Sequence, residues 1–299
     1  MSDGPAARTA APTVCVVGLG LMGRPAARRL AEAGISVRGW NRSPLDPALA
    51  DGIEQVATLA EAAAADVVLL LLANSVATGE LLAALDPHLR RGSVVLNMGT
   101  DDPVDSRQRA AALAARGVGW VDAPVSGGPE KTVTGRLAIM AGGNDEDVRR
   151  VWPVLEGLGG AVTHVGGPGA GHTMKLVNQV IVAIAVDAVA EALALAEAAG
   201  FTVPEVQKAL HGGNADNPQL DVMGTRMGAR YYEPAAAKVR TMLKDIRIAQ
   251  RLAAELGLVL PLLEVAAAQY AALADRGDAD SDVSMLIELR RPRETVDPG

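Results

Sequence analysis

The stretch TVCVVGLGLMGRPAARRLAEAG, residues 13–34, decides the fold. A short apolar run leads into three glycines at GxGxxG spacing, and a helical pattern then continues to Gly34. In a strand–turn–helix unit, the first two glycines permit a tight turn and a close approach of pyrophosphate, and the third lets helix pack on strand. A merely tight turn is the alternative, but the context favours a dinucleotide site. The residues expected to contact the dinucleotide are Gly18, Gly20, Leu21, Met22 and Gly23.

Short β-branched runs alternate with helical patterns from 13 to 165. This alternation predicts a parallel sheet covered by helices on both faces. Thr58 and Glu61 have the spacing of a capping box and predict a helix start. The expected strands are TVCVV, ISVRGW, DVVLLLL, SVVLNM, WVDAPV, RLAIMA and AVTHV.

After Gly166 the strand pattern stops, and the glycine-rich GGPGAG marks a domain boundary. Helices are expected over 171–199, 203–211, 219–227, 238–256, 261–274 and 281–289. The fold class is therefore α/β: a Rossmann-type parallel-sheet domain, followed by an all-α C-terminal domain, joined by a long helix. We place an NADP-binding domain at 13–167 and a substrate and oligomerisation domain at 168–299. Residues 1–12 and the tail RRPRETVDPG are expected to be disordered.

Composition excludes several classes of protein. The 299 residues suffice for two domains, and a net charge of −7 with dispersed Lys and Arg argues against nucleic-acid binding. Cys15 is the only cysteine, and the four histidines lack ligand spacing, so we expect no metal. Uninterrupted apolar runs such as 67–73 are too short to span a membrane, and the first residues lack a signal-like apolar core. These features favour a cytoplasmic protein.

The end of the second expected strand bears on cofactor choice. A site that prefers NAD usually has Asp or Glu here to bind the ribose 2′-hydroxyl. This chain has Asn41, Arg42 and Ser43 instead. The guanidinium of Arg42 matches a 2′-phosphate and Ser43 can donate a hydrogen bond, so we predict NADP, with NAD as the alternative.

Lys175 lies in the apolar segment GHTMKLVNQVIVAIAV, residues 171–186. A lone helical lysine is usually solvated, but a helix that is apolar almost all round is buried, and a buried ammonium is costly. Asn178 and Gln179 follow at i+3 and i+4 and therefore share its face. Such a polar patch predicts a cleft, where an ammonium could stabilise an alkoxide and donate a proton after hydride transfer.

Four motifs occur in order: VGLGLMG, DAPVSGGPEKTVTGRLAIMAGG, GAGHTMKLVNQ and MLKD. In this the chain resembles the β-hydroxyacid dehydrogenases, which include 3-hydroxyisobutyrate dehydrogenases and tartronate semialdehyde reductases. The resemblance covers about 13–289 and implies a Rossmann-type domain followed by a helical one. It further implies a small hydroxy acid or semialdehyde as substrate and a homodimer or homotetramer.

The site residues of this family can be assigned to the matching positions of this sequence. The resemblance implies that Lys175 is the catalytic residue and that Thr100 lies near the nicotinamide. Residues implied to bind substrate are Ser126, Gly127, Gly128, and Asn178 or Gln179. Those implied to bind cofactor are Asn74 and Lys244, with Asp245 beside the latter. The NQ pair and Lys131 are closer to the tartronate semialdehyde reductases.

Two departures bear on the substrate. Ala73 replaces the usual Pro before Asn74, and PAAAK at 234–238 replaces an aromatic-containing PGF with one extra residue. These changes make one wall of the substrate pocket smaller and shift it by one residue. The pocket is therefore expected to tolerate substrates somewhat larger than tartronate semialdehyde. Two other functions stay open: an imine reductase of related fold, which would generally lack this lysine, and a non-catalytic NADP-binding protein.

Overall fold

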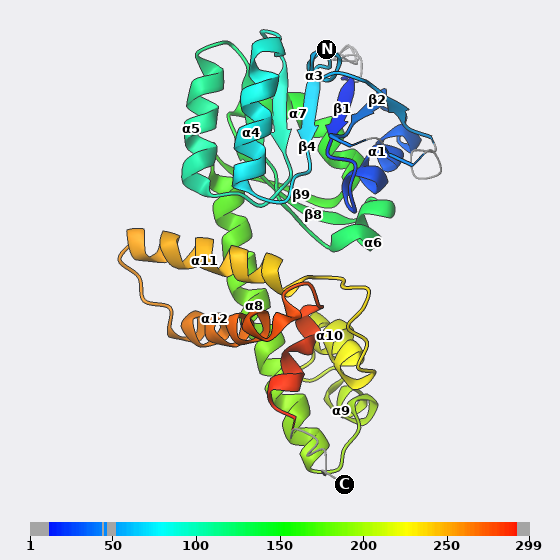
Figure 1. Ribbon diagram of the computed structural model, residues 1–299, viewed down its shortest axis with the longest axis vertical. Coiled ribbons are helices and arrows are strands. Elements are labelled where there is room, and N and C mark those ends of the chain that lie inside the picture. Colours follow the sequence, from blue (N-terminus) through cyan, green and yellow to red (C-terminus); the bar gives the residue numbers. More distant parts are fainter. Residues whose placement is uncertain (1–11, 44, 47–51, 292–299) are drawn as a thin grey trace, which may run out of the picture. The chain divides into compact units, whose positions relative to one another are not determined.

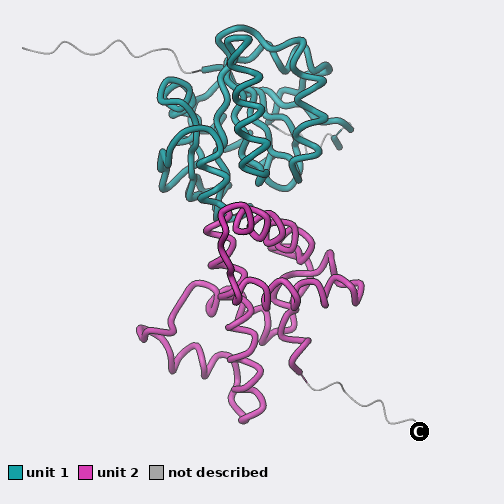
Figure 2. The backbone as a smooth tube through the Cα atoms, turned by 90° about the vertical axis from the view of Figure 1, so that its left-hand side faces the viewer, with its two compact units in different colours: residues 1–175 teal, residues 176–299 magenta. Residues whose placement is uncertain are grey.

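The computed structural model describes residues 12–43, 45–46 and 52–291. The chain forms two compact units, residues 1–175 and 176–299 (Figure 2), each with its own core. The predicted disordered ends lie outside the described residues, except at three positions. Pro12 has no regular structure, whereas Arg290 and Arg291 form ion pairs with Asp187 and Glu197 at 2.5 Å. The prediction of a disordered tail is therefore wrong for these two arginines.

Unit 1 contains a nine-stranded sheet in the order β3-β2-β1-β4-β5-β6-β8-β7, with β9 paired to β8. The strands are β1 (Val14–Val17), β2 (Val37–Trp40), β3 (Glu54–Gln55), β4 (Val67–Leu70), β5 (Val94–Asn97), β6 (Gly119–Asp122), β7 (Val125–Ser126), β8 (Leu137–Gly143) and β9 (Gly159–Gly166). Strands β1 to β6 pair in parallel, as predicted. Strand β8 differs from the prediction, because it runs antiparallel to β6 and β7.

Helices cover both faces of this sheet, and the two-residue period of the strands explains why (Figure 1). Val14 and Val16 belong to the core under the helices at 23–32 and 145–158, whereas Cys15 and Val17 belong to the core under the helices at 59–63, 75–85 and 103–114. The helices are α1 (Gly23–Glu32), α3 (Leu59–Ala63), α4 (Ser75–Leu85), α5 (Pro103–Ala114), α6 (Gly128–Val133) and α7 (Asp145–Leu158). The capping box is confirmed at α3, where the Thr58 side chain accepts from the N–H of Glu61.

Unit 2 is helical. It comprises most of α8 (Ala170–Ala198), then α9 (Val203–Leu210), α10 (Pro218–Gly228), α11 (Val239–Glu255) and α12 (Pro261–Leu273). The last predicted helix is a 3-10 segment over Val283–Leu289. Leu176, Ala183 and Leu193 of α8 belong to the core of unit 2. Among the described residues, α8 is the one helix long and apolar enough to cross a membrane, a property that domain-core helices share.

Helix α8 is less buried than its composition predicts. Lys175 is buried, as expected, and so is Leu176. However, Met174, Val177 and Ile181 are exposed. The prediction of burial all round α8 is therefore wrong, because an apolar composition does not tell which face of a helix finds a partner.

Candidate active site

Most residues predicted to form the site in unit 1 lie at one edge of its sheet. The strands β1, β2, β4, β5 and β6 are parallel, so their carboxyl ends meet at the same edge. In doubly wound sheets, ligands bind outside this edge where the strand order reverses, here between β1 and β4. The residues that follow these strand ends are Gly18–Gly23, Asn41–Ser43, Asn74, Thr100 and Ser126–Gly128.

The turn after β1 has the geometry that a dinucleotide cradle requires. Gly18 has φ +96°, and a Cβ there would lie 2.6 Å from the carbonyl oxygen of Leu71. At Gly23 a Cβ would lie 1.9 Å from the carbonyl oxygen of Gly18, so helix and turn pack too closely for any other residue. At Gly20 a Cβ would meet nothing within 4 Å, which leaves the backbone open to a ligand. The three glycines therefore fit a bound pyrophosphate.

Asn41 connects the loop after β2 to this turn. Its Oδ1 accepts from the N–H of Leu19 at 3.1 Å, and its Nδ2 donates to the carbonyl of Ser43 at 2.9 Å. Asn41 thus supports the glycine turn, and a direct cofactor contact by this side chain stays a prediction. Arg42 and Ser43 are exposed.

The loops after β4 and β5 are joined by a polar network that the sequence did not reveal. Asn74 caps α4 by accepting from the N–H of Ala77 at 2.9 Å. Arg109 donates to the carbonyl of Ser75 at 2.8 Å and to the buried carboxylate of Asp101 at 2.9 Å. Since Thr100 precedes Asp101, the network fixes the loop on which the nicotinamide contact is predicted.

The turn Ser126–Gly128 combines a hydroxyl with two flexible backbone positions. Gly127 has φ +133° and Gly128 has φ +68°, conformations that side chains rarely permit. A Cβ on Gly128 would meet nothing within 4 Å, so its surroundings are open. The stem of Lys131 lies against Gly127, where a Cβ would come within 2.6 Å of Cδ. Successive glycine N–H groups of this kind can bind an anion.

Lys175 lies on the second turn of α8, with 8% of its surface exposed. The first turn is held by Asp122 at the end of β6, which accepts the N–H of Gly169 at 2.7 Å and of His172 at 2.9 Å. Burial raises the pKa of Asp122, while His172 and these N–H groups oppose the rise. His172 itself is fully buried. Sequence reasoning did not identify Asp122 as a site residue. An acidic residue at the end of a buried strand was a signal that could have indicated it.

In unit 2, the carboxylate of Asp245 brings three predicted residues together. Gln179 donates to Asp245 at 2.6 Å, and Lys244 pairs with it at 3.0 Å. Asn178 donates to Oε1 of Gln179 at 2.9 Å. The bond from Gln179 to Asp245 links α8 to α11. Gln179 is buried, whereas Asn178 is half-buried.

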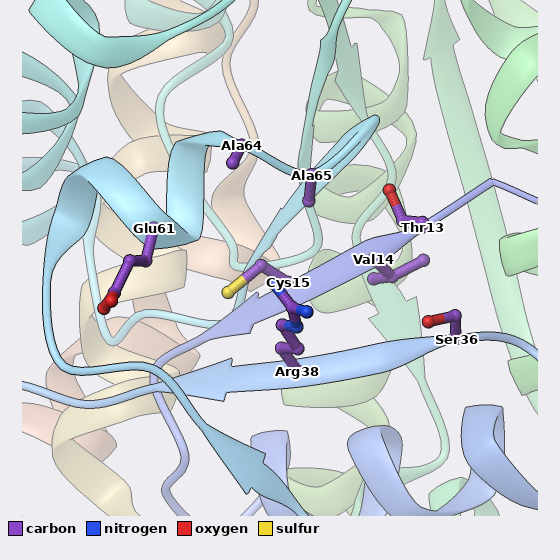
Figure 3. A pocket seen from close by; sticks show the side chains of 8 residues that line it. All are labelled: Thr13, Val14, Cys15, Ser36, Arg38, Glu61, Ala64 and Ala65. Carbon is purple, nitrogen blue, oxygen red and sulfur yellow. The ribbon is translucent and has the colours of Figure 1, made fainter.

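A separate hollow of about 150 Å³ opens at the opposite, amino-terminal edge of the sheet (Figure 3). It is lined by Thr13, Val14, Cys15, Ser36, Arg38, Glu61, Ala64 and Ala65. Burial raises the pKa of Cys15 to about 12, so this sulfur stays a thiol at neutral pH and is a poor nucleophile. None of the predicted site residues lines this hollow.

Comparisons with known proteins agree with the fold and the motifs. Residues 13–166 match the NAD-binding domain of 6-phosphogluconate dehydrogenase, and residues 169–290 match the NAD-binding family of NADP-dependent 3-hydroxyisobutyrate dehydrogenase. The 2-hydroxy-3-oxopropionate reductase of Escherichia coli is 34% identical over 91% of this chain and 94% of that protein.

Two solved structures are also similar. A 3-hydroxyisobutyrate dehydrogenase from Salmonella typhimurium has a TM-score of 0.84 at 29% identity, covering 93% of this chain and 99% of that one. An imine reductase from a Pseudomonas species has a TM-score of 0.60 at 23% identity, covering 93% and 98%, and shares the fold. The chain belongs to the β-hydroxyacid dehydrogenase family and is an NAD(P)-dependent dehydrogenase or reductase that acts on hydroxyl groups.

Proposed function

We propose that this protein interconverts a small β-hydroxy acid and its aldehyde or keto acid, as a tartronate semialdehyde reductase or a 3-hydroxyisobutyrate dehydrogenase does. One observation carries the proposal. A buried lysine, Lys175, lies on a helix whose first turn is anchored to the carboxyl end of β6, in the same unit as the glycine cradle and the Ser126–Gly128 turn.

The proposed division of labour follows from the chemistry of these groups. The nicotinamide supplies or takes up the hydride. The ammonium of Lys175 stabilises the alkoxide that develops on the substrate oxygen and donates a proton to it, and the neutral amine accepts that proton in the reverse direction. The Ser126 hydroxyl and the N–H groups of Gly127 and Gly128 bind the substrate carboxylate. Asn178 or Gln179 orients the substrate. The side-chain amide of Gln179 donates to Asp245, and that of Asn178 donates to Gln179.

NADP is the proposed cofactor. Support comes from the exposed Arg42 and Ser43 after β2, where no carboxylate opposes a 2′-phosphate among Asn41–Ser43. The turn Gly18–Gly23 would hold the pyrophosphate, with Asn74, Thr100 and Lys244 as further contacts. We assign cofactor binding to a domain at 13–167 and substrate binding to the helical domain at 168–299. The proposed location is the cytoplasm.

We also propose a homodimer or homotetramer. Large apolar side chains of unit 2 are exposed between the end of α11 and the second turn of α12. They are Leu256, Leu258, Val259, Leu262 and Val265. Exposed apolar groups that cluster in this way commonly mark an association surface, and a second copy would cover the same residues.

The deciding experiment compares an aldehyde acid with the same aldehyde lacking its carboxylate, in the wild type and in Ser126→Ala. The wild type should prefer the acid, because a hydrogen bond to a charged group contributes ~1.5–3 kcal/mol. Ser126→Ala should lose about ten- to a hundredfold in kcat/KM for the acid and little for the other aldehyde. Equal use of both aldehydes, unaffected by Ser126→Ala, would refute the acid substrate.

Imine reduction is the second candidate, and the shared fold supports it. Lys175 argues against it as the native activity, since imine reductases of this fold generally lack such a lysine. A cyclic imine added to the same assay decides between the two. A protein that binds NADPH but turns over neither class would be a non-catalytic binder.

A further inference from the structure

The first turn of α8 is fixed to the sheet by one buried carboxylate. The first N–H groups of a helix have no partner within it, and Asp122 accepts two such groups, from Gly169 and His172. The contact is close as well as polar. A Cβ on Gly171 would lie 2.2 Å from the carbonyl oxygen of Asp122 and 2.4 Å from that of Met140. Helix α8 therefore cannot shift along β6 without breaking both hydrogen bonds.

The side chain of His172 fixes a second element. Its Nε2 lies 3.1 Å from the carbonyl oxygen of Gly99, in the loop after β5. Since a carbonyl only accepts, Nε2 carries the proton in this contact. His172 is fully buried, and its Nδ1, 3.8 Å from Asp122, has no hydrogen-bond partner among the described residues. The bond to Gly99 is thus the one hydrogen bond of this ring that the structure describes.

The loop that receives this bond is held from its other side too. The N–H of Gly99 donates to Oδ1 of Asn97 at 3.1 Å, and Nδ2 of Asn97 donates to Asp101 at 2.8 Å. A Cβ on Gly99 would lie 2.9 Å from the carbonyl oxygen of Leu72. His172 joins this loop to α8 through its hydrogen bond to Gly99.

We propose that Asp122 and His172 are positioning residues that hold Lys175 in register with the loop carrying Thr100. His172 joins three elements, because its backbone N–H binds Asp122 while its ring binds Gly99. Lys175 follows three residues later on the same helix, hence on the same face. Ser126 follows Asp122 by four residues along the chain. Because the carboxylate of Asp122 binds the start of α8, it also limits movement between α8 and the Ser126–Gly128 turn. The inference rests on the proposed function, since it gives Lys175 and Thr100 their roles.

The test compares two substitutions of His172 in the full-length protein. His172→Phe keeps the ring volume but removes the donor to Gly99. His172→Gln places an amide N–H near the position of Nε2 and can restore that donor. His88→Phe, an exposed position far along the chain, is the matched control.

His172→Phe should lower kcat roughly ten- to a hundredfold, since small misplacements of reacting groups have effects of this size. The KM for the acid and the Kd for NADPH should stay within about threefold, because the residues proposed to bind them are unchanged. His172→Gln should recover most of kcat, and His88→Phe should match the wild type. Equal kcat in folded His172→Phe and wild type would overturn the proposal, and so would a failure of Gln to do better than Phe.

A second measurement does not need a substrate. Amide hydrogen exchange in peptides spanning 98–102 should become roughly tenfold faster in His172→Phe but not in His172→Gln, while β1 stays protected. Exchange that rises throughout unit 1 would show general destabilisation and overturn the positioning role. If the wild type reduces no acid yet the loop responds in this way, the contact stands and the proposed function fails, so the two failures are distinguishable.

Discussion

Lys175 is the residue on which the proposed chemistry depends most directly. It lies on α8, six residues after the Gly169 whose N–H is bound by Asp122, and it is almost fully buried. The anchored helix fixes the backbone of this lysine before any substrate arrives, and a proton donor must be positioned in this way.

We expect Lys175→Ala to lose about 10²–10⁴-fold in kcat, the usual contribution of a general acid. The Kd for NADPH, from nucleotide fluorescence, should change little, because the glycine turn after β1 is untouched. Lys208→Ala, at an exposed lysine on α9, serves as the control and should be as active as the wild type. Near-normal turnover in folded Lys175→Ala would remove Lys175 from the mechanism.

Arg42 is expected to decide between the two nicotinamide cofactors. Loss of its guanidinium should lower kcat/KM for NADPH about ten- to a hundredfold, with little effect on NADH, since only NADPH has the 2′-phosphate. The measurement is kcat/KM with each cofactor in wild type, Arg42→Ala and Arg149→Ala, an exposed arginine on α7. A wild type without cofactor preference would contradict the NADP assignment.

Part of the site was predictable because its signals are local. The glycine spacing is read from neighbouring residues alone. The bond between Gln179 and Asp245 joins positions 66 residues apart, and Asp122 reaches Gly169 over 47. Such contacts depend on how the helices and strands pack together, and a local sequence pattern does not predict them.

At the scale of elements, the parallel strands β1, β2, β4, β5 and β6 were predictable from their β-branched runs. Strands β3 and β7 have two residues each, too few to show a period. The direction of β8 also escaped prediction, because alternation of apolar residues is the same in parallel and antiparallel strands. The path of the chain between Ser126 and Leu137 decides that direction.

Asp66 joins the beginnings of two central strands and makes stability depend on pH. It accepts the N–H of Thr13 at 3.0 Å and its hydroxyl at 2.7 Å, and it pairs with Arg90. The bonds from Thr13 hold the pKa of Asp66 below its usual range. A lowered pKa means that the carboxylate stabilises the fold above the unfolded-state pKa, and that this contribution is lost as pH falls through the folded-state value.

We therefore expect the stability gap between wild type and Asp66→Asn to be present at pH 6 and to shrink as pH falls from about 4 toward 2. The gap should be about 1 kcal/mol or less, since the group is exposed and screened. Urea unfolding at a series of pH values measures it. A gap independent of pH would contradict the assignment.

At the scale of the whole molecule, the exposed apolar residues before and on α12 bear on assembly. Burying a leucine contributes about 1.5–3 kcal/mol, so Leu262→Glu should raise the dissociation constant of a dimer at least about tenfold. Sedimentation velocity over a range of concentrations detects the change, with Val222→Glu, an exposed valine of α10, as the control. A wild type that is monomeric at every concentration would refute the proposed oligomer.

The position of α8 has a consequence for recombination between related genes. The boundary between the two units falls after Lys175, so only residues 170–175 of this 29-residue helix belong to unit 1. A helix of so few residues does not hold its shape alone. A chimera spliced at that boundary would join two foreign half-helices, whereas a crossover in the glycine-rich 166–169 keeps the helix whole. Lys175 would then be inherited with the helical half, although it belongs to unit 1, and hybrid enzymes made there should take their proton donor from the C-terminal parent.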